Sequence, residues 1–354
     1  MQTQLKKNVV KWEMINKIAL AGCGNVGTAL LEILYEKKEE LAQKYNFLFE
    51  VTMITDLFKG TVADPEGLDL AAVLRELHTN NSLKALGEKE GSFEEVLLWS
   101  QATMLAEATP TNLETGEPGL SFIKAALRNG ISVTMTNKGP IYVAMDELLE
   151  LARQNNAKLR YEGAIMSGTP LISMIRTGLA GCDIIKAEGI LNGTTNYILS
   201  EMSEGKDFAE ALKSAQELGY AEANPTGDVE GWDSSVKVAI LSKLIYNRAL
   251  NISEIDREGI LSITLDDIIS AKREKCEIKL IASIEKTEDG GLKAKVAPTK
   301  IPLAHPLAPV TGPTNAITIT TDNLGEVTLV GPGAGRKETG QALLTDLIAI
   351  SKEK

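Results

Sequence analysis

Short apolar runs alternate with segments that carry one apolar helical face over the first 160 residues of the chain. Residues 15–21 (INKIALA) form an apolar run that predicts a buried strand, and apolar residues at positions 26, 30, 31 and 34 then predict an amphipathic helix. The same reasoning predicts strands at 47–54, 104–108, 131–136 and 158–162, helices at 120–129 and 145–155, and helical and loop elaboration at 61–100. This order predicts an α/β fold with a parallel, doubly wound sheet.

A glycine-rich turn, GCGNVG at residues 22–27, joins the first strand to the first helix. This context matches the Rossmann-type dinucleotide-binding fingerprint: Gly22 permits the tight turn, Gly24 admits a pyrophosphate and Gly27 lets helix and strand pack. Asn25 and Val26 open the helix, whose positive end would face the phosphates. The alternative is a glycine-rich turn that binds nothing.

Residues that follow the later strands are candidates for the same ligand. Asp56 is placed to accept a hydrogen bond from an adenosine ribose, as in NAD, whereas Lys59 is placed to meet the 2′-phosphate of NADP. Thr109 in EATPTN and Lys138 in TNKGP also follow strands, at the edge where open α/β sheets bind ligands. The alternative for Lys138 is a solvated loop lysine. NAD and NADP both remain open.

After residue 155 the pattern changes to that of a second domain. It predicts a helix near 208–218, strands near 293–296, 316–320 and 326–330, and a last helix at 340–351. We therefore expect a dinucleotide-binding domain at 15–155, rejoined by residues 335–354, and an α+β catalytic and dimerisation domain with a mixed sheet at 156–334. Residues 1–14 match no pattern and are treated as an N-terminal extension.

The segment YAEANPTGDVEGWDSSVKVAIL, residues 220–241, carries the candidate catalytic groups. Its loop holds Glu222 and Asp228, and its helix places Asp233 and Lys237 four residues apart on one face. Apolar residues surround Lys237 in sequence, and burial disfavours an ammonium ion, which moves a lysine pKa toward the range of proton transfer. The alternative is an ordinary surface ion pair.

Composition excludes several classes of partner and of catalytic site. A net charge of −11 argues against nucleic acid and anionic membranes as partners, and no apolar run is long enough to span a bilayer. Two histidines give little support to a His-based metal site or a Ser-His-Asp triad. Cys23, Cys182 and Cys276 lie far apart and suggest no disulfide framework, so we expect a cytoplasmic protein.

The chain resembles homoserine dehydrogenases along nearly its whole length. The matching segments, in the family's order, are GCGNVG, EATPTN with TGEPGL, TNKGP, EGAIMSGTP, GILNGTTNYIL, YAEANPTGDVEGWDSSVKVAIL and GPGAG. The resemblance implies interconversion of L-aspartate 4-semialdehyde and L-homoserine with NADP or NAD, a step in threonine, methionine and isoleucine biosynthesis. It also implies a homodimer and a bound monovalent cation, Na⁺ or K⁺.

The resemblance further assigns residues. Lys237 matches the catalytic lysine, Asp233 a carboxylate at the substrate, and Glu222 one that grips the substrate amino group. The remaining matches are Lys138 toward cofactor and substrate; Gly22, Gly24, Asn25, Val26, Gly27, Thr109 and Gly335 for the cofactor; and Glu162, Ile165, Ser167 and Thr169 for the cation, largely through backbone oxygens. From residue types alone, the last four would be a tight turn between domains.

The chain also departs from the family. Asn224 stands where aspartate is common, Ser234 and Ser235 replace alanines, and GRKETGQAL near the C-terminus replaces a proline-threonine version. A fused kinase and a regulatory ACT domain are not expected. Two other functions stay open: a non-catalytic NAD(P)-binding sensor on the same fold, and an aspartate-semialdehyde dehydrogenase with Cys182 as nucleophile, for which no base adjoins in sequence.

Overall fold

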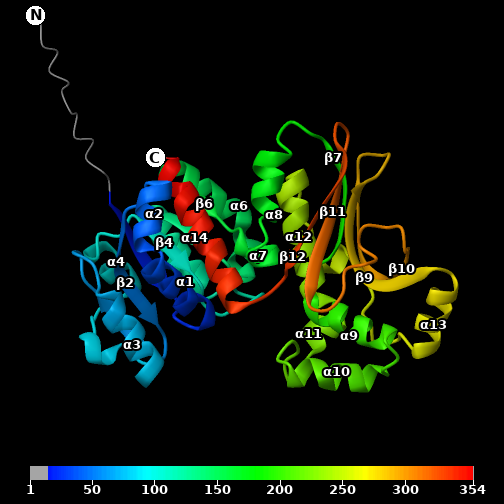
Figure 1. Ribbon diagram of the computed structural model, residues 1–354. Coiled ribbons are helices and arrows are strands. Elements are labelled where there is room, and N and C mark those ends of the chain that lie inside the picture. Colours follow the sequence, from blue (N-terminus) through cyan, green and yellow to red (C-terminus); the bar gives the residue numbers. More distant parts are fainter. Residues whose placement is uncertain (1–14, 354) are drawn as a thin grey trace, which may run out of the picture.

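The computed structural model describes residues 15–353, which form two six-stranded sheets with helices packed on them (Figure 1). The expected extension, residues 1–14, lies outside the described residues. The predicted fold class, a Rossmann-type sheet followed by an α+β region with a mixed sheet, is confirmed. No helix within residues 15–353 has both the length and the apolar character that crossing a membrane requires.

The first sheet has the strand order β3-β2-β1-β4-β5-β6, in which β1 pairs in parallel with both β2 and β4. The strand order therefore reverses between β1 and β4, which is where doubly wound sheets bind ligands. The short β3, absent from the sequence prediction, pairs antiparallel with β2. The strands are β1 Asn16–Ala21, β2 Phe49–Asp56, β3 Gly60–Ala63, β4 Met104–Glu107, β5 Ser132–Met135 and β6 Leu159–Arg160.

The helices of this half include the last helix of the chain, which lies beside the first (Figure 1). Leu30 and Leu34 of α1 share one buried cluster with Leu343 and Leu347 of α14, and Gly340 of α14 lies against the α1 backbone. The helices are α1 Asn25–Glu36, α2 Lys38–Tyr45, α3 Leu70–Asn80, α4 Phe93–Trp99, α5 Gly119–Arg128, α6 Lys138–Gln154 and α14 Arg336–Lys352, with a 3₁₀ turn at Lys84–Leu86.

Helix α6 begins earlier than the predicted 145–155. The Asn137 side chain accepts a hydrogen bond from the backbone N–H of Gly139 at 3.0 Å and so caps a helix that starts at Lys138. Ala144 has non-helical dihedral angles (φ −141°, ψ 27°), and this kink interrupts the apolar periodicity on which the prediction relied. Lys138 therefore lies in the first turn of a helix and not in a loop.

The second sheet has the order β12-β11-β7-β9-β10-β8 and is mixed, since β8 pairs parallel with β10 and the other pairs are antiparallel. Its longest hairpin, β9-β10, includes a strand, β9, that the sequence analysis did not predict. The strands are β7 Ile184–Ile190, β8 Asp256–Arg257, β9 Cys276–Lys286, β10 Leu292–Pro302, β11 Thr314–Thr321 and β12 Gly325–Pro332.

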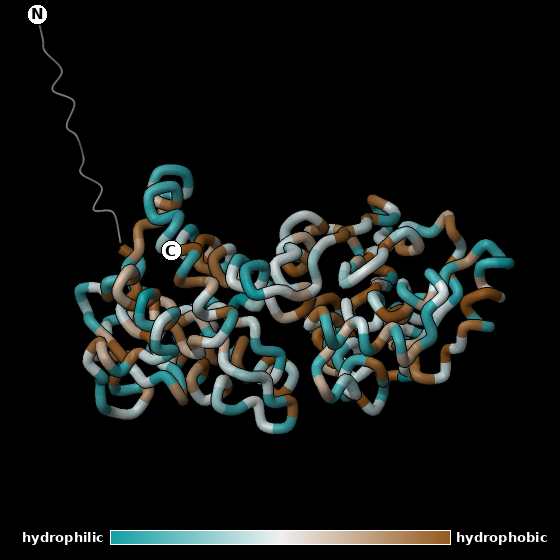
Figure 2. The backbone as a smooth tube through the Cα atoms, turned by 60° about the horizontal axis from the view of Figure 1, so that its bottom comes forward, coloured by the Kyte–Doolittle hydropathy of each residue, from teal (hydrophilic) through white to brown (hydrophobic). Residues whose placement is uncertain are grey.

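Helices α9, α12 and α13 pack on one face of this sheet. The helices of this half are α9 Gly193–Ser203, α10 Phe208–Glu217, α11 Thr226–Val229, α12 Trp232–Tyr246 and α13 Leu265–Arg273, with a 3₁₀ turn at Ile252–Glu254. Short helical turns join the two sheets: α7 Gly163–Met166, α8 Leu171–Ser173 and a π-turn at Met174–Gly178. Apolar segments run through the interior of both halves (Figure 2).

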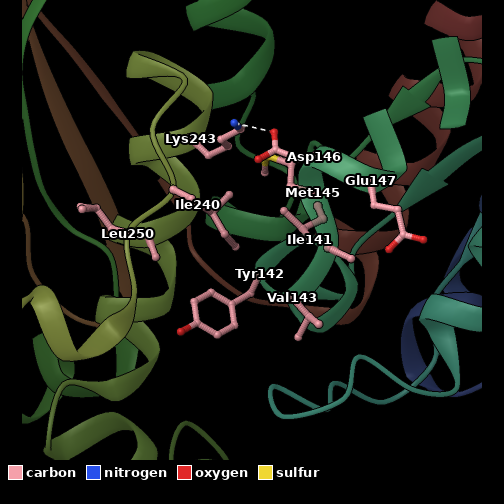
Figure 3. A pocket seen from close by; sticks show the side chains of 12 residues that line it. Ile141, Tyr142, Val143, Met145, Asp146, Glu147, Ile240, Lys243 and Leu250 are labelled. Carbon is pink, nitrogen blue, oxygen red and sulfur yellow. Dashed lines mark ion pairs between the residues drawn. The ribbon is translucent and has the colours of Figure 1, made fainter. Parts of the chain in front are cut away.

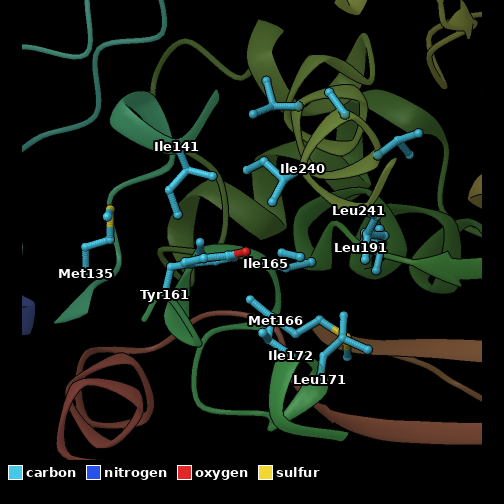
Figure 4. Packing of buried hydrophobic residues seen from close by; sticks show 14 of the residues in the cluster. Met135, Ile141, Tyr161, Ile165, Met166, Leu171, Ile172, Leu191, Ile240 and Leu241 are labelled. Atoms are coloured by element: carbon cyan, nitrogen blue, oxygen red, sulfur yellow. The ribbon is translucent and has the colours of Figure 1, made fainter. Parts of the chain in front are cut away.

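The apolar core continues across the junction of the halves (Figure 4). Tyr161 and Ile165 of the connecting segment, Ile141 of α6, and Ile240 and Leu241 of α12 belong to one buried cluster. Burial of this many large side chains stabilises the junction. This shared core therefore places α6 and α12, one from each half, side by side.

Candidate active site

The glycine loop has the geometry that the sequence predicts. Gly22 has φ +88°, and a Cβ there would lie 2.5 Å from the Ala108 backbone, while a Cβ on Gly27 would lie 2.0 Å from the Gly22 oxygen. A Cβ on Gly24 would meet nothing within 4 Å, so the backbone here is open. No side chain caps the N-terminus of α1, which leaves its first N–H groups for an anion.

A cavity of about 460 Å³ adjoins this loop and is formed largely by residues from the first half. Asn25 and Val26 line it at the start of α1, and Gly335 lines it at the start of α14. Thr109 and Lys138, which follow β4 and β5, complete the wall toward the second half. Of the sequence-predicted cofactor residues, these five line the cavity, whereas Gly22, Gly24 and Gly27 are not among its lining residues.

The acidic and basic residues after β2 both contact the glycine loop. One Asp56 carboxylate oxygen accepts a hydrogen bond from the N–H of Cys23 at 2.9 Å, and the Lys59 ammonium donates to the Cys23 carbonyl at 2.5 Å. Between them, Leu57 and Phe58 are 87% and 85% exposed. Asp56 is thereby held against the glycine loop at the end of β2, next to two exposed apolar side chains.

Two lysines share one carboxylate at the junction of the halves. The Lys138 ammonium lies 2.5 Å from one oxygen of Asp233, and the Lys237 ammonium lies 2.7 Å from the other. Lys237 also donates to the backbone carbonyl of Leu191 at 2.5 Å, just past the end of β7. The Asp233–Lys237 pair is therefore not the ordinary surface pair of the alternative, because Lys237 is only 6% exposed.

The three charges perturb one another. Burial lowers the pKa of Lys237 and the nearby Lys138 lowers it further, while the attraction of Asp233 opposes both. Burial also acts to lower the pKa of Lys138, but attraction and hydrogen bonding to Asp233 outweigh it and raise that pKa. Burial acts against the Asp233 carboxylate, yet the two lysines hold its pKa well below the ordinary range. Of the two lysines, Lys237 is thus the one whose pKa is lowered.

Asn192 and Asp228 complete the cluster; the sequence placed Asp228 in the candidate loop but gave no signal for Asn192. The Asn192 amide donates to Asp228 at 2.6 Å and to Asp233 at 3.1 Å, while its oxygen accepts from the N–H of Thr195 and caps α9. Burial raises the pKa of Asp228. These contacts join residues 36 and 41 positions apart, a separation that leaves no spacing signal in the sequence.

A second cavity, of about 790 Å³, adjoins the same lysines. Asn192, Asp228 and Asp233 line it, and Lys138 and Lys237 line both cavities, so a ligand in each would meet at the lysines. Glu222 is exposed and lines a neighbouring cavity of about 420 Å³ that shares Lys138, Asp228 and Asp233. It therefore lies near the cluster without forming part of it.

A further cavity, of about 300 Å³, lies between α6 and α12 away from these groups (Figure 3). Ile141, Ile240 and Leu250 give it apolar walls, and its ion pair joins Lys243 to Asp146 at 2.5 Å. The Asp146 side chain is 71% exposed. This cavity shares none of its lining residues with the two that contain Lys138 and Lys237.

The segment expected to bind a cation links the two halves. The Glu162 carboxylate accepts from the N–H groups of Ile172 and Ser173, both at 2.8 Å. The Thr169 hydroxyl donates to the Pro332 carbonyl, and the Ser167 hydroxyl bonds to a threonine of α14. Within residues 15–353, no cluster of three or more His, Cys, Asp or Glu is arranged for a metal. Ile165 is buried.

Comparison with known proteins places both halves in one family. The family model described as homoserine dehydrogenase matches residues 170–348, and the model described as homoserine dehydrogenase, NAD binding domain, matches residues 22–162. An NAD(+)-dependent homoserine dehydrogenase of Pseudomonas canavaninivorans is 43% identical over 336 residues, covering 94% of this chain and 96% of that protein. A homoserine dehydrogenase of Methanocaldococcus jannaschii is 39% identical, covering 94% and 98%.

Solved structures of homoserine dehydrogenases are also similar to this chain. A putative homoserine dehydrogenase from Archaeoglobus fulgidus superimposes with a TM-score of 0.86 at 34% identity, covering 96% of this chain and 99% of that one. A hyperthermophilic archaeal homoserine dehydrogenase in complex with NADPH superimposes with a TM-score of 0.82 at 32% identity, with the same coverage.

Proposed function

The chain belongs to the homoserine dehydrogenase family, and we propose that Lys138, Asp233 and Lys237 carry out its reaction, the NAD(P)-dependent interconversion of L-aspartate 4-semialdehyde and L-homoserine. The observation that carries this assignment is the position of both lysines on the shared wall of two cavities. One cavity adjoins the glycine loop and suits the cofactor. The other is lined by carboxylates and suits an amino acid.

Lys237 is the proposed proton donor and acceptor. Two of the positions around its nitrogen are taken by the Leu191 carbonyl and Asp233, which leaves the third for a ligand. An ammonium ion would donate a proton there to the aldehyde oxygen during reduction, and a neutral amine would accept one from the homoserine hydroxyl during oxidation. The nicotinamide cofactor supplies the hydride chemistry. Lys138 adds a second positive charge that stabilises the developing alkoxide.

The remaining polar groups suit the amino acid end of the substrate. Asp228 and Glu222 offer carboxylates to the substrate ammonium group. Gly193 and Thr194, at the N-terminus of α9, line the same cavity and offer backbone N–H groups to the substrate carboxylate. Asp233 keeps both lysines in place, so its role is orientation and charge balance.

The activity test compares two alcohols at fixed NAD⁺. L-Homoserine should be oxidised, whereas 1-propanol, which lacks the ammonium and carboxylate groups, should react at least 100-fold more slowly. Equal rates would show that the carboxylate-lined cavity does not select the substrate. Cofactor binding without any turnover would favour the non-catalytic sensor, and loss of activity on alkylation of Cys182 would favour the thiol-dependent alternative.

For the cofactor, we propose that NAD is preferred over NADP. The Asp56 carboxylate would repel a 2′-phosphate, and the Lys59 ammonium is already bonded to the Cys23 carbonyl. The ratio of kcat/KM for NADH to that for NADPH should therefore exceed one, and Asp56→Ser should lower it by at least tenfold. In the matched variant Lys59→Met, a large loss of NADPH activity would show instead that Lys59 binds the phosphate.

We also propose a monovalent cation site at the backbone carbonyls of Glu162, Ile165, Ser167 and Thr169. The hydrogen bonds of the Glu162, Ser167 and Thr169 side chains support this, because they leave uncharged carbonyl oxygens as donors, a set suited to Na⁺ or K⁺. The melting temperature should rise when KCl or NaCl replaces tetramethylammonium chloride at equal ionic strength. No difference between the three salts would count against the site.

The domain arrangement and assembly are likewise proposals. Residues 15–155 with 335–354 form the dinucleotide-binding domain and residues 156–334 the catalytic and dimerisation domain, which the packing of α14 on α1 supports. We propose a homodimer in the cytoplasm; the exposed edge strand β12, with Val330 52% exposed, is one surface available to a second copy. Light scattering should give twice the chain mass of 38.1 kDa.

A further inference from the structure

Glu107, the last residue of β4, is a fully buried carboxyl group that the proposed mechanism does not use. Its Oε1 atom accepts hydrogen bonds from the N–H of Thr109 at 2.8 Å and from the Thr109 hydroxyl. The Asn137 amide donates to the same oxygen at 3.4 Å. Its Oε2 atom has no hydrogen-bond partner among the described residues. All of its contacts thus converge on one oxygen.

This arrangement is costly for stability. Burial raises the pKa of Glu107 to about 7, although the donors on Thr109 and Asn137 oppose the shift. A buried oxygen without a partner is unfavourable, and an apolar side chain of similar volume would avoid that cost. Gly119 of α5 packs closely against Glu107 and Asn137, since a Cβ there would lie 2.8 Å from the Asn137 amide and 2.9 Å from Glu107. Packing and stability alone therefore do not explain a glutamate here.

The contacts of Glu107 lead to both parts of the site. Thr109 lines the cofactor cavity. The Asn137 amide lies within reach of three acceptors on the segment after β4, Glu107 at 3.4 Å and Thr109 and Pro110 at 3.3 Å. The Asn137 oxygen caps α6 through Gly139, and the next residue after Asn137 is Lys138. The Glu107 carboxyl oxygen is therefore linked through Asn137 to Lys138, which forms the ion pair with Asp233.

We propose that Glu107 is a positioning residue that acts through Thr109 on the cofactor and through Asn137 on Lys138. With both the cofactor loop and the start of α6 held to one oxygen, the hydride acceptor and the lysine keep a fixed mutual position. Small displacements matter in such a site, because a misplacement of about 1 Å can cost about 100-fold in rate. The inference rests on the proposed function of Lys138.

The test exchanges the two groups that face each other. Asn137→Asp keeps an oxygen to cap α6 but places a carboxylate against Glu107, Thr109 and Pro110, so kcat should fall by at least tenfold. Glu107→Gln keeps an acceptor oxygen for Thr109 and should change kcat by less than about threefold. The double variant restores an amide opposite a carboxylate, so it should recover most of the activity that Asn137→Asp loses.

Controls separate this role from a structural one. Thr52→Val is the matched change in the same sheet, since Thr52 is also fully buried with an unpartnered oxygen, and it should leave kcat unchanged. Melting temperatures should not follow the order of the kcat values. Additive losses in the double variant, or losses that parallel the melting temperature, would overturn the proposal. An inactive wild-type protein would instead refute the proposed function, and the two failures are thus distinguishable.

Discussion

Removal of either neighbour of Lys237 should move the pH dependence of homoserine oxidation, and in opposite directions. Oxidation needs the neutral amine, so its rate rises as pH increases through the pKa of Lys237. Asp233 attracts the ammonium form and Lys138 repels it. Asp233→Asn should therefore shift the rising limb to lower pH, and Lys138→Met should shift it to higher pH.

The contact distances set the size of these shifts. Two unit charges 2.7 Å apart, as in the Lys237–Asp233 pair, interact with about 6 kcal/mol at an effective dielectric constant of 20 and about 1.5 kcal/mol in water. Because one pKa unit corresponds to about 1.4 kcal/mol, Asp233→Asn should lower the limb by about one to four pH units. Lys138→Met should give a smaller shift, because Lys138 contacts the far oxygen of Asp233 and not Lys237 itself.

The assay is the initial rate of NAD⁺ reduction by L-homoserine at saturating substrate, in buffers of constant ionic strength. The rate is measured from roughly pH 6 to 11, a range chosen to include the pKa of a lysine that is lowered from its ordinary value. Both variants should be slower than the wild type, so the result is the pH at which the rate rises and not the maximal rate. Shifts in the same direction for both variants, or none, would refute Lys237 as the titrating base.

Three further outcomes are expected. Lys237→Ala should lower kcat by about 10²–10⁴-fold while NADH affinity, measured by fluorescence titration, is retained; an equal loss of affinity would contradict the assignment. Asp228→Asn should raise the KM for L-homoserine at least tenfold with little effect on the KM for the cofactor, and the reverse pattern would contradict its place at the substrate. Burial raises the pKa of Asp346 from 3.8 to about 7. The stability that this group contributes is therefore present below about pH 4 and is lost as pH rises through about 7. Asp346→Asn should flatten the decline of the melting temperature between pH 5 and 8, and an unchanged slope would argue against the raised pKa.

Local patterns were enough to predict five of the six strands of the first sheet, all except the short β3. The apolar run before GCGNVG and the amphipathic segment after it predict β1 and α1 within a residue or two, because both elements bury one consistent face. The long hairpin strand β9 was missed because five consecutive residues, Ile278 to Ala282, are buried and include the charged Lys279, so the strand shows neither clean alternation nor an unbroken apolar run. The early start of α6 was missed because the kink at Ala144 breaks the period of the apolar face.

The site shows the same limit more clearly. Asp233 and Lys237 are neighbours on one helix turn, so their spacing predicts their contact. Lys138 reaches the same carboxylate from 95 positions away, and Asn192 from 41. Only the packing of α6 against α12 and the position of β7 bring these groups together, and neither follows from periodicity. The role of Glu107 depends likewise on two loops that meet at the edge of the first sheet.

Catalysis by Lys237 is tested most directly by the rate of NADH oxidation by L-aspartate 4-semialdehyde, measured for the wild-type protein and for Lys237→Ala in parallel. The wild type should oxidise NADH rapidly and only with substrate present, and the variant should lose at least 100-fold in rate with NADH still bound. Equal rates for the two folded proteins would contradict the role of Lys237, and no oxidation by a wild type that binds both NADH and NADPH would contradict the proposed catalysis itself.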